Sequence, residues 1–523
     1  MNVKVLRHAR IYTGDLRYPW AQALAIVDGK VAAWDSDALA WGERTGAVVE
    51  DLEGALVLPG LIDAHVHLMW YALSLNELDL RGLSKEQLLA CLAERGARTP
   101  AGSWIRGRGW DQNLWPEGRF PTAADLDSVV SHAPVLLTAK NAHAAVANTR
   151  ALQLAGIRAT TPDPDHGRLG RSGDGSPDGM LFERAIEMVL SAIPEPDPSA
   201  VAAALDEVQE HLLAAGLTGI HDVDAGPAFA AFQKLHQEDR LKVRVVKYIQ
   251  SDALEGALAV GLRSGFGTEM LRFGGLKLFA DGALGARTAA LFAPYDGEPE
   301  NTGALTLEPE QLRGIVQRAV KGGMAVEVHA IGDRAVHEVL NAFEDVRPDG
   351  RGLRHRVEHV QLISPADLPR MTRLGVIASM QPIHATHDWA MAERYWGTRT
   401  AFAYPWLSLL RAGVPLAFGS DAPIESFNPL LGLYAAVTRR HEADGSPGPD
   451  GWHPEQRLTL AQAVRAYTRG AAYAAGTEGV VGTLSTGLCA DLVVLDRDIF
   501  ELPPEALLEA RVLRTMVGGT WQF

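Results

Sequence analysis

Short apolar runs alternate with amphipathic helical stretches through the middle of the chain. This alternation is typical of a parallel β/α fold, in which a helix covers the crossover between successive strands. We predict eight such strands, at residues 56–67, 218–223, 243–249, 274–280, 325–330, 355–360, 376–381 and 415–421. Eight strands are the number that closes a (β/α)₈ TIM-like barrel, and a doubly wound open sheet is the alternative.

The two ends of the chain carry a different pattern, short apolar strands separated by tight turns. Near the start these are residues 3–6, 23–27 and 31–34, and near the end 490–496 and 512–517. We expect residues 1–55 and 480–523 to form one small composite β-sandwich domain, because either end alone would bury little apolar surface. Two independent small domains are the alternative. The barrel would then occupy residues 56–479.

The gap between the first and second predicted strands is far too long for an ordinary βα connection. Residues 69–200 are therefore predicted to form an insertion after barrel strand 1. Loops at the carboxyl ends of barrel strands build the active site, so we expect this insertion to roof it. A dimerisation arm is the alternative.

Composition narrows the class of protein. Of the 523 residues 47% are apolar and 22% charged, which is ordinary for a globular protein, and the net charge of −15 argues against nucleic acid or an anionic membrane as partner. Two distant cysteines favour a reducing compartment over a disulfide framework. With no signal-peptide pattern and no apolar run long enough for a membrane span, we predict a cytoplasmic protein.

Two histidines lie at the end of the first predicted barrel strand, at a spacing suited to metal binding. Side chains on a strand alternate between faces, so His65 and His67 should project to the same side, roughly 7 Å apart. Imidazole suits zinc and other divalent transition metals. The pair by itself could equally be structural, so the prediction depends on further ligands elsewhere in the chain.

Further polar residues stand at the ends of other predicted strands. His329 ends the fifth strand, His359 the sixth and Asp421 the eighth. A single histidine on an apolar strand is more often a core residue. Several polar groups at corresponding strand ends are harder to explain by packing, because buried polar groups are costly unless paired or bound to a ligand. The set predicts a metal centre at the catalytic face of the barrel.

The chain resembles the metal-dependent amidohydrolase superfamily over nearly its whole length. The motifs that carry the resemblance are Pro59-Gly60-Leu61-Ile62-Asp63-Ala64-His65-Val66-His67, Val328-His329-Ala330-Ile331-Gly332-Asp333, Val357-Glu358-His359 and Gly419-Ser420-Asp421-Ala422-Pro423. It is most similar to the amidohydrolase family 3 branch, which includes N-substituted formamide deformylases. That branch has a long insertion after the first strand, with a motif like Gly109-Trp110-Asp111-Gln112.

The resemblance also gives a role to a lysine on the fourth strand. In binuclear family members the lysine at the position of Lys277 is carboxylated, and its carbamate bridges two metals. A carbamate offers two oxygens and a negative charge, which suits divalent cations. From the sequence alone, a lysine that reaches solvent or pairs with Asp281 is the simpler interpretation.

The mechanism implied by the resemblance uses a metal-activated hydroxide. His65 and His67 would bind one metal with Asp421, and His329 and His359 the second, with the carboxylated Lys277 as bridging ligand. Two Zn²⁺ ions per chain are expected, with Mn²⁺ or Fe²⁺ as alternatives. Asp421 would accept a proton from the nucleophile and pass it to the leaving nitrogen. A mononuclear, deaminase-like site with an ordinary lysine remains open.

Other polar residues are candidates for contact with substrate. They are His221 at the end of the second strand, Gln381 at the end of the seventh, and His143 and Trp110 in the insertion. His221 could equally be a core residue, and Trp110 could only anchor its loop. His384 and His387, after the seventh strand, are interpreted as loop residues.

These features predict a hydrolase of carbon–nitrogen bonds other than peptide bonds, acting on a small-molecule amide of the N-formyl or N-acyl class. A deaminase or cyclic-amide hydrolase on the same scaffold is the first alternative. A catalytically silent metal-binding protein is the second. A homodimer is what the family suggests.

Overall fold

The computed structural model describes residues 2–112, 115–140, 144–164, 167–346 and 352–523. The chain divides into two compact units. The first combines Met1–Tyr71 with Pro198–Phe523, and the second is Ala72–Asp197. The second unit thus falls within the region predicted as an insertion.

Eight parallel strands of the first unit form one sheet in which spatial order follows chain order. They are β8 (Leu61–Val66), β15 (Leu217–Asp222), β16 (Arg244–Gln250), β17 (Leu271–Phe279), β18 (Ala325–Ala330), β19 (Arg356–His359), β20 (Ile377–Met380) and β21 (Leu416–Phe418). Each predicted strand overlaps one of them. A doubly wound sheet would reverse its strand order midway, so the sequential order rules that alternative out.

The sheet closes where its first and last strands meet. The backbone N–H of Asp421 donates to the carbonyl of His65 at 2.7 Å, and that of His67 donates to Ala422 at 2.9 Å. The buried Asp63 carboxylate of β8 adds a side-chain link, accepting the Ser420 N–H at 3.0 Å and its hydroxyl at 2.5 Å. The predicted (β/α)₈ barrel is therefore confirmed.

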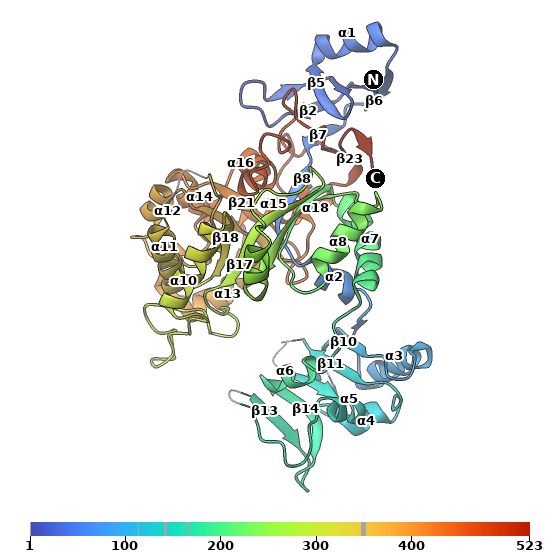
Figure 1. Ribbon diagram of the computed structural model, residues 1–523, viewed down its shortest axis with the longest axis vertical. Coiled ribbons are helices and arrows are strands. Elements are labelled where there is room, and N and C mark those ends of the chain that lie inside the picture. The colour runs from blue at the N-terminus through green and yellow to red at the C-terminus, as the bar shows by residue number, and fades with distance from the viewer. Residues whose placement is uncertain (1, 113–114, 141–143, 165–166, 347–351) are drawn as a thin grey trace. The chain divides into compact units, whose positions relative to one another are not determined.

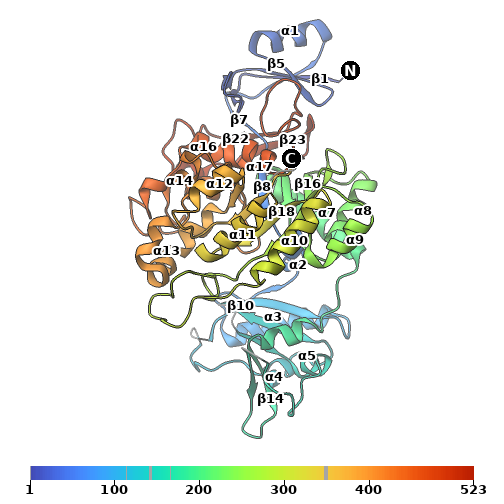
Figure 2. The same ribbon diagram turned by 60° about the vertical axis from the view of Figure 1, so that its left-hand side comes forward.

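Helices cover the outside of the barrel in both ribbon views (Figures 1 and 2). They include α7 (Pro198–Ala214), α8 (Ala228–Gln237), α9 (Leu254–Ala259), α10 (Pro309–Lys321), α11 (Asp333–Asp345), α12 (Leu368–Leu374), α13 (Pro382–Trp396), α14 (Trp406–Arg411), α15 (Pro429–Thr438), α16 (Leu460–Arg465) and α17 (Ala471–Ala474). In α10 the buried positions Leu312, Val316 and Ala319 recur every three or four residues, which gives one apolar face toward the sheet.

Within the described residues, no helix has the length and apolar character needed to cross a membrane.

Two further sheets pack face to face as a β-sandwich. One has the order β5-β4-β1-β6 and the other β24-β23-β22-β7-β2-β3. The strands are β1 (Val3–Arg7), β2 (Arg10–Tyr12), β3 (Trp20–Ala21), β4 (Leu24–Val27), β5 (Lys30–Trp34), β6 (Val48–Asp51), β7 (Leu56–Pro59), β22 (Leu492–Leu495), β23 (Val512–Val517) and β24 (Thr520–Trp521). Helix α1 (Asp35–Thr45) joins β5 to β6. Leu6, Ile26, Val57 and Val494 lie in one shared core, so both termini build this sandwich.

The predicted strand 56–67 proves to be two strands with different partners. β7 pairs with β22 and β2 in the sandwich, whereas β8 pairs with β15 in the barrel. Gly60 separates them, and a Cβ at this position would lie 2.2 Å from Thr218 Oγ1. The close approach of β15 thus requires glycine at the change of sheet.

The second unit is a six-stranded sheet with the order β13-β14-β12-β11-β10-β9. Its elements are β9 (Leu78–Asp79), α3 (Lys85–Arg98), β10 (Ile105–Trp110), α4 (Ala123–Asp127), β11 (Val135–Ala139), β12 (Ala144–Ala147), α5 (Thr149–Leu154), β13 (Gly167–Arg171), β14 (Pro177–Glu183) and α6 (Ala185–Leu190). Leu137 and Val146 pack in one apolar core with α3, while Leu136 and Ala145 pack in another with α5 and α6. The alternation of faces along β11 and β12 therefore gives this unit two cores of its own.

Candidate metal centre

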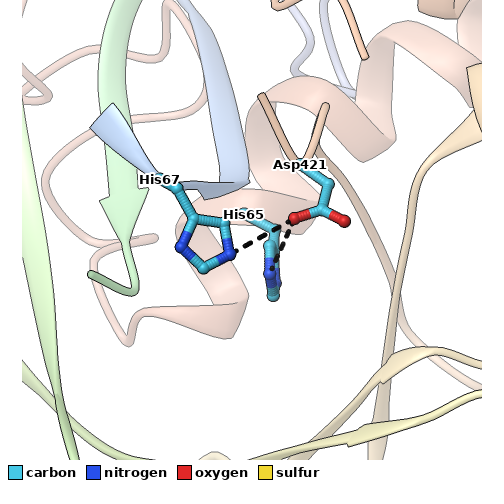
Figure 3. A group of neighbouring side chains, drawn as sticks. All are labelled: His65, His67 and Asp421. Carbon is cyan, nitrogen blue, oxygen red and sulfur yellow. Dashed lines mark ion pairs between the residues drawn. The ribbon is translucent and has the colours of Figure 1, made fainter. Parts of the chain in front are cut away.

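Closure of the barrel brings the two ends of the predicted ligand set together. His65 lies on β8, His67 directly follows it, and Asp421 lies three residues beyond β21. Asp421 Oδ1 is 3.5 Å from His65 Nε2 and 3.4 Å from His67 Nε2 (Figure 3). One ligand atom from each of the three lies within 4.8 Å of the others, so a single cation could be bound by all three.

Two residues of the site have left-handed backbone conformations. The φ angle is 62° at Asp421 and 74° at His359. Non-glycine residues rarely adopt this region, and where they do the surrounding structure must hold them there. Asp421 is held in this conformation by the hydrogen bond from its backbone N–H to the His65 carbonyl, where the barrel closes.

A carboxylate lies behind each histidine of the first pair. His65 Nδ1 is 2.5 Å from Glu358 Oε2, and His67 Nδ1 is 3.2 Å from Asp224 Oδ1. The carboxylate accepts the Nδ1 proton, so the lone pair on His65 Nε2 faces Asp421. This arrangement is usual for metal-binding histidines, because it fixes the ring and raises its basicity.

The charges at the site suit a cation. Burial, reinforced by the nearby Lys277 ammonium, lowers the pKa of His65 well below its usual value, so the ring is neutral. Burial opposes a charge on His67, but hydrogen bonds to Asp224 and Asp421 outweigh it and raise the pKa of His67 to about 9. Burial alone would raise the pKa of Asp421, yet the His67 hydrogen bond and nearby imidazoles hold it well below its usual value. A proton on His67 thus lies where a metal would bind, and metal binding should release it.

Lys277 is buried beside this group and does not reach solvent. Its side chain is on β17, the residue is 1% exposed, and its Nζ lies 3.4 Å from His65 Nε2. The Asp281 carboxylate instead accepts backbone N–H groups of Ala290, Ile331 and Gly332. The simpler interpretation of Lys277, as a residue that reaches solvent or pairs with Asp281, is therefore wrong.

His329 and His359 come from adjacent strands, with ring centroids 4.6 Å apart. His329 Nε2–H donates to the Gly282 carbonyl at 3.0 Å, which leaves Nδ1 as its metal-binding nitrogen. His359 Nδ1–H donates to Gln381 Oε1 at 2.8 Å, which leaves Nε2. Burial lowers the pKa of both rings, so both are neutral, but of the two only His359 belongs to a possible ligand group among the described residues. Gln381, which was predicted to contact substrate, accepts this hydrogen bond with its side-chain oxygen and so orients the His359 ring.

His384 is a residue of the site that the sequence analysis missed. It lies in the first turn of α13 and not in a loop, because Pro382 occupies the first helical position, where proline is favoured. His384 Nε2 is 3.7 Å from Asp421 Oδ2, and His359, His384 and Asp421 form a second possible ligand group. Its position immediately after a barrel strand was the one available signal. His387 lies one turn further along α13, with its ring between Glu425 and Glu442.

The remaining predicted substrate residues have structural contacts. His221 is buried, and its Nδ1 accepts a hydrogen bond from Arg356 Nη1 at 2.9 Å, so it belongs to the barrel interior. Trp110 is fully buried in the second unit, where its Nε1–H donates to the Leu137 carbonyl at 2.8 Å. These contacts favour the anchoring role for Trp110. His143 lies outside the described residues.

The buried residues around His221 form a polar network beneath the site. Arg356, fully buried, pairs with Glu327 and with Glu358, and Glu358 in turn accepts from His65. Sequence reasoning missed Glu358 and Asp224 as well as this network. Charged residues on apolar strands were the signal for Glu358, since such residues are rarely buried without a partner.

The donor set fits a metal ion of borderline hardness. It offers the His65 imidazole, held neutral by burial, the His67 imidazole, whose proton a metal would replace, and the ionised carboxylate of Asp421. Glu358 and Asp224 orient the two rings from behind. Zinc and its neighbours among the divalent transition metals favour such a set.

Comparison with known proteins agrees with this site. The family model described as "Amidohydrolase family" matches residues 48–521. The chain is 32% identical to the protein LONG AFTER FAR-RED 3 of Arabidopsis thaliana, over 98% of this chain and 90% of that protein. It is 29% identical to the N-substituted formamide deformylase of Arthrobacter pascens, over 99% and 97% of the two chains. The crystal structure of an uncharacterized metal-dependent hydrolase from Pyrococcus horikoshii OT3 is 31% identical, with a TM-score of 0.84 over 96% and 99% of the two chains.

The family model spans nearly the whole chain, and the described residues at the barrel mouth include groups that could hold a metal ion. The chain therefore belongs to the amidohydrolase family, as a metal-dependent hydrolase of carbon–nitrogen bonds.

Proposed function

We propose that the protein cleaves a non-peptide amide of the N-formyl or N-acyl class in a small molecule. The observation that carries this proposal is the ionised, buried carboxylate of Asp421, which lies 3.5 Å from the neutral His65 imidazole that Glu358 orients. The similarity to an N-substituted formamide deformylase along 99% of this chain favours an N-substituted formamide among these substrates.

Each residue of the site then has a defined task. His65, His67 and Asp421 would hold one metal ion, and His329 and His359 would hold a second. When bound, the metal would polarise the amide carbonyl and lower the pKa of water. Asp421 accepts the proton of the attacking water and delivers it to the nitrogen of the breaking carbon–nitrogen bond. Glu358 and Asp224 keep the first two rings in orientation during this transfer.

The test of this function uses purified protein loaded with Zn²⁺, or with Mn²⁺ as a second metal. We expect it to release formate from aromatic and aliphatic N-substituted formamides, with turnover abolished by a chelator and restored by metal. Other N-acyl amines, cyclic amides and amino-substituted heterocycles complete the panel. Activity on cyclic amides alone, or release of ammonia from a heterocycle, would overturn the proposed substrate class.

We further propose that Lys277 is carboxylated and bridges two metal ions. Its Nζ lies beside His65, and burial lowers the pKa of Lys277, which favours the free amine that adds CO₂ with loss of a proton. The Lys277→Ala variant should lose metal and activity, and short carboxylic acids should restore part of both, because they supply two oxygens at the same place. Elemental analysis and turnover with added acetate or propionate measure this. Full metal content and activity in the variant would disprove the bridging role.

A further inference from the structure

His384 has an unusual environment for a buried histidine. The residue is 6% exposed, and its Nε2 has no hydrogen-bond partner among the residues that the structure describes. Asp421 Oδ2 is 3.7 Å from this nitrogen, which is too long for a hydrogen bond. A buried polar nitrogen is normally paired, so this one requires an explanation.

Two glutamines hold His359 and His384 in a reciprocal arrangement across two neighbouring strand ends. The Oε1 of Gln381, which follows β20, lies 2.8 Å from His359 Nδ1, whereas the Nε2 of Gln361, which follows β19, lies 3.3 Å from His384 Nδ1. The two rings are stacked, with centroids 5.9 Å apart and an interplanar angle of 19°. Both rings are therefore fixed through Nδ1, and both leave Nε2 for another partner.

The amide of Gln361 can supply the tautomer that metal binding requires. Its Oε1 is buried and has no hydrogen-bond partner within the described part of the chain. An amide presents either its oxygen or its nitrogen by turning about its last bond. With the oxygen toward His384, Nδ1–H donates to it and the lone pair lies on Nε2, as Gln381 already arranges for His359.

The carboxylate of Asp421 faces two groups of histidines with its two oxygens. Oδ1 lies near His65 and His67, and Oδ2 lies near His384 (Figure 3 shows the first group). Ligand atoms of His359, His384 and Asp421 all lie within 4.8 Å of one another, and all three residues are buried. Two imidazoles and a carboxylate are a usual ligand set for a catalytic zinc site.

We propose that His384 is a metal ligand, which with His359 and Asp421 binds a second divalent cation of the Zn²⁺ class. This inference rests on the metal dependence in the proposed function and adds a ligand from the seventh strand's end to those predicted from the sequence. Asp421 then connects two cation sites, one at each oxygen.

The test compares the metal content of wild-type protein with that of His384→Ala, both loaded with Zn²⁺ and freed of excess by gel filtration. We expect the variant to hold one equivalent fewer, or to bind that equivalent at least tenfold more weakly in a chelator competition. The visible spectrum of the Co²⁺-loaded protein should lose the contribution of one site. His337→Ala is the matched control, because His337 is a helix imidazole that pairs with Asp367 and belongs to none of the ligand groups.

An unchanged Zn²⁺ content and affinity, with an unchanged Co²⁺ spectrum, in His384→Ala would overturn the inference. Circular dichroism reports whether the variant folds. If His384→Ala does not fold, the same measurements are made on His384→Leu, because leucine fills the space of the ring without offering a ligand atom. Metal counting decides this question independently of turnover. If His384→Ala holds one Zn²⁺ equivalent fewer than wild type, and the wild-type protein hydrolyses no amide, only the proposed function is refuted.

Discussion

At the scale of single residues, the candidate metal ligands are oriented by partners outside the possible ligand groups. Glu358 accepts the Nδ1 proton of His65 and also pairs with the buried Arg356. Arg356 also pairs with Glu327, so a substitution of Glu358 does not leave the Arg356 charge unpaired. Glu358 is therefore a positioning residue that can be tested on its own.

We expect Glu358→Gln to weaken metal binding by about 10–100-fold, the usual effect of removing such a partner. A neutral amide is a poorer acceptor than a carboxylate, so the His65 ring loses basicity and orientation. Competition with a chromophoric chelator measures the affinity, and Glu210→Gln, at a carboxylate whose side chain is 72% exposed, is the control. Equal affinities for the two variants would show that Glu358 does not orient His65.

Asp421 is the residue assigned to proton transfer. Asp421→Asn should lower kcat by roughly 10²–10⁴-fold, the usual contribution of a positioned acid–base group. The backbone bond from Asp421 to His65 is retained in the variant, so the fold should persist by circular dichroism. The measurement is steady-state kcat with the formamide that the wild-type protein hydrolyses fastest. Turnover equal to wild type would remove Asp421 from the chemistry.

Residues with a local pattern could be predicted, whereas residues with a purely spatial role could not. His65, His67 and Asp421 stand at strand ends inside recognisable motifs, and the structure brings them together. His384 was interpreted as a loop residue because nothing in its neighbourhood tells which way its ring points. That direction depends on Gln361 and on the start of α13.

At the scale of elements, the closure between β21 and β8 determines whether the site forms. A Cβ at Gly419 would lie 2.5 Å from the backbone nitrogen of His65 and 2.6 Å from Asp63 Oδ1. One of the two strands must therefore shift if any side chain is added here. Such a shift would move His65 relative to Asp421.

We expect Gly419→Ala to destabilise the protein by about 1–3 kcal/mol, as overpacking usually does, and to weaken metal binding as well. Gly256→Ala is the matched control, because Gly256 lies in α9 and nothing lies within 4 Å of an added Cβ. Thermal unfolding and chelator competition on both variants give the comparison. A Gly419→Ala protein with the Tm and metal affinity of the control would show that the closure tolerates a side chain.

The elements themselves followed from apolar patterning, but their partners did not. The run 56–67 reads as one strand because its apolar residues are continuous. The structure divides it at Gly60 into a sandwich strand and a barrel strand. The division depends on Thr218, about 160 residues away, so no local pattern could reveal it.

At the scale of the whole molecule, the second unit has the properties of an independently folding domain. Ala72–Asp197 contains a complete six-stranded sheet and two apolar cores. Its length is within the usual range of single domains. We expect the isolated fragment 72–197 to unfold cooperatively on heating, followed by circular dichroism. A fragment that melts without a cooperative transition would show that its cores depend on the rest of the chain.

The barrel, the sandwich from both termini and the strand ends that carry the polar residues were predictable from local patterns in the sequence. Strand formation follows from the alternation and burial of nearby residues, so this information is local. The tertiary structure decided which atoms meet: Asp421 with His65 and His67, and His384 with His359. These residues come from different elements of the chain, and the directions of their ring nitrogens depend on closure of the barrel and on hydrogen bonds from other strands.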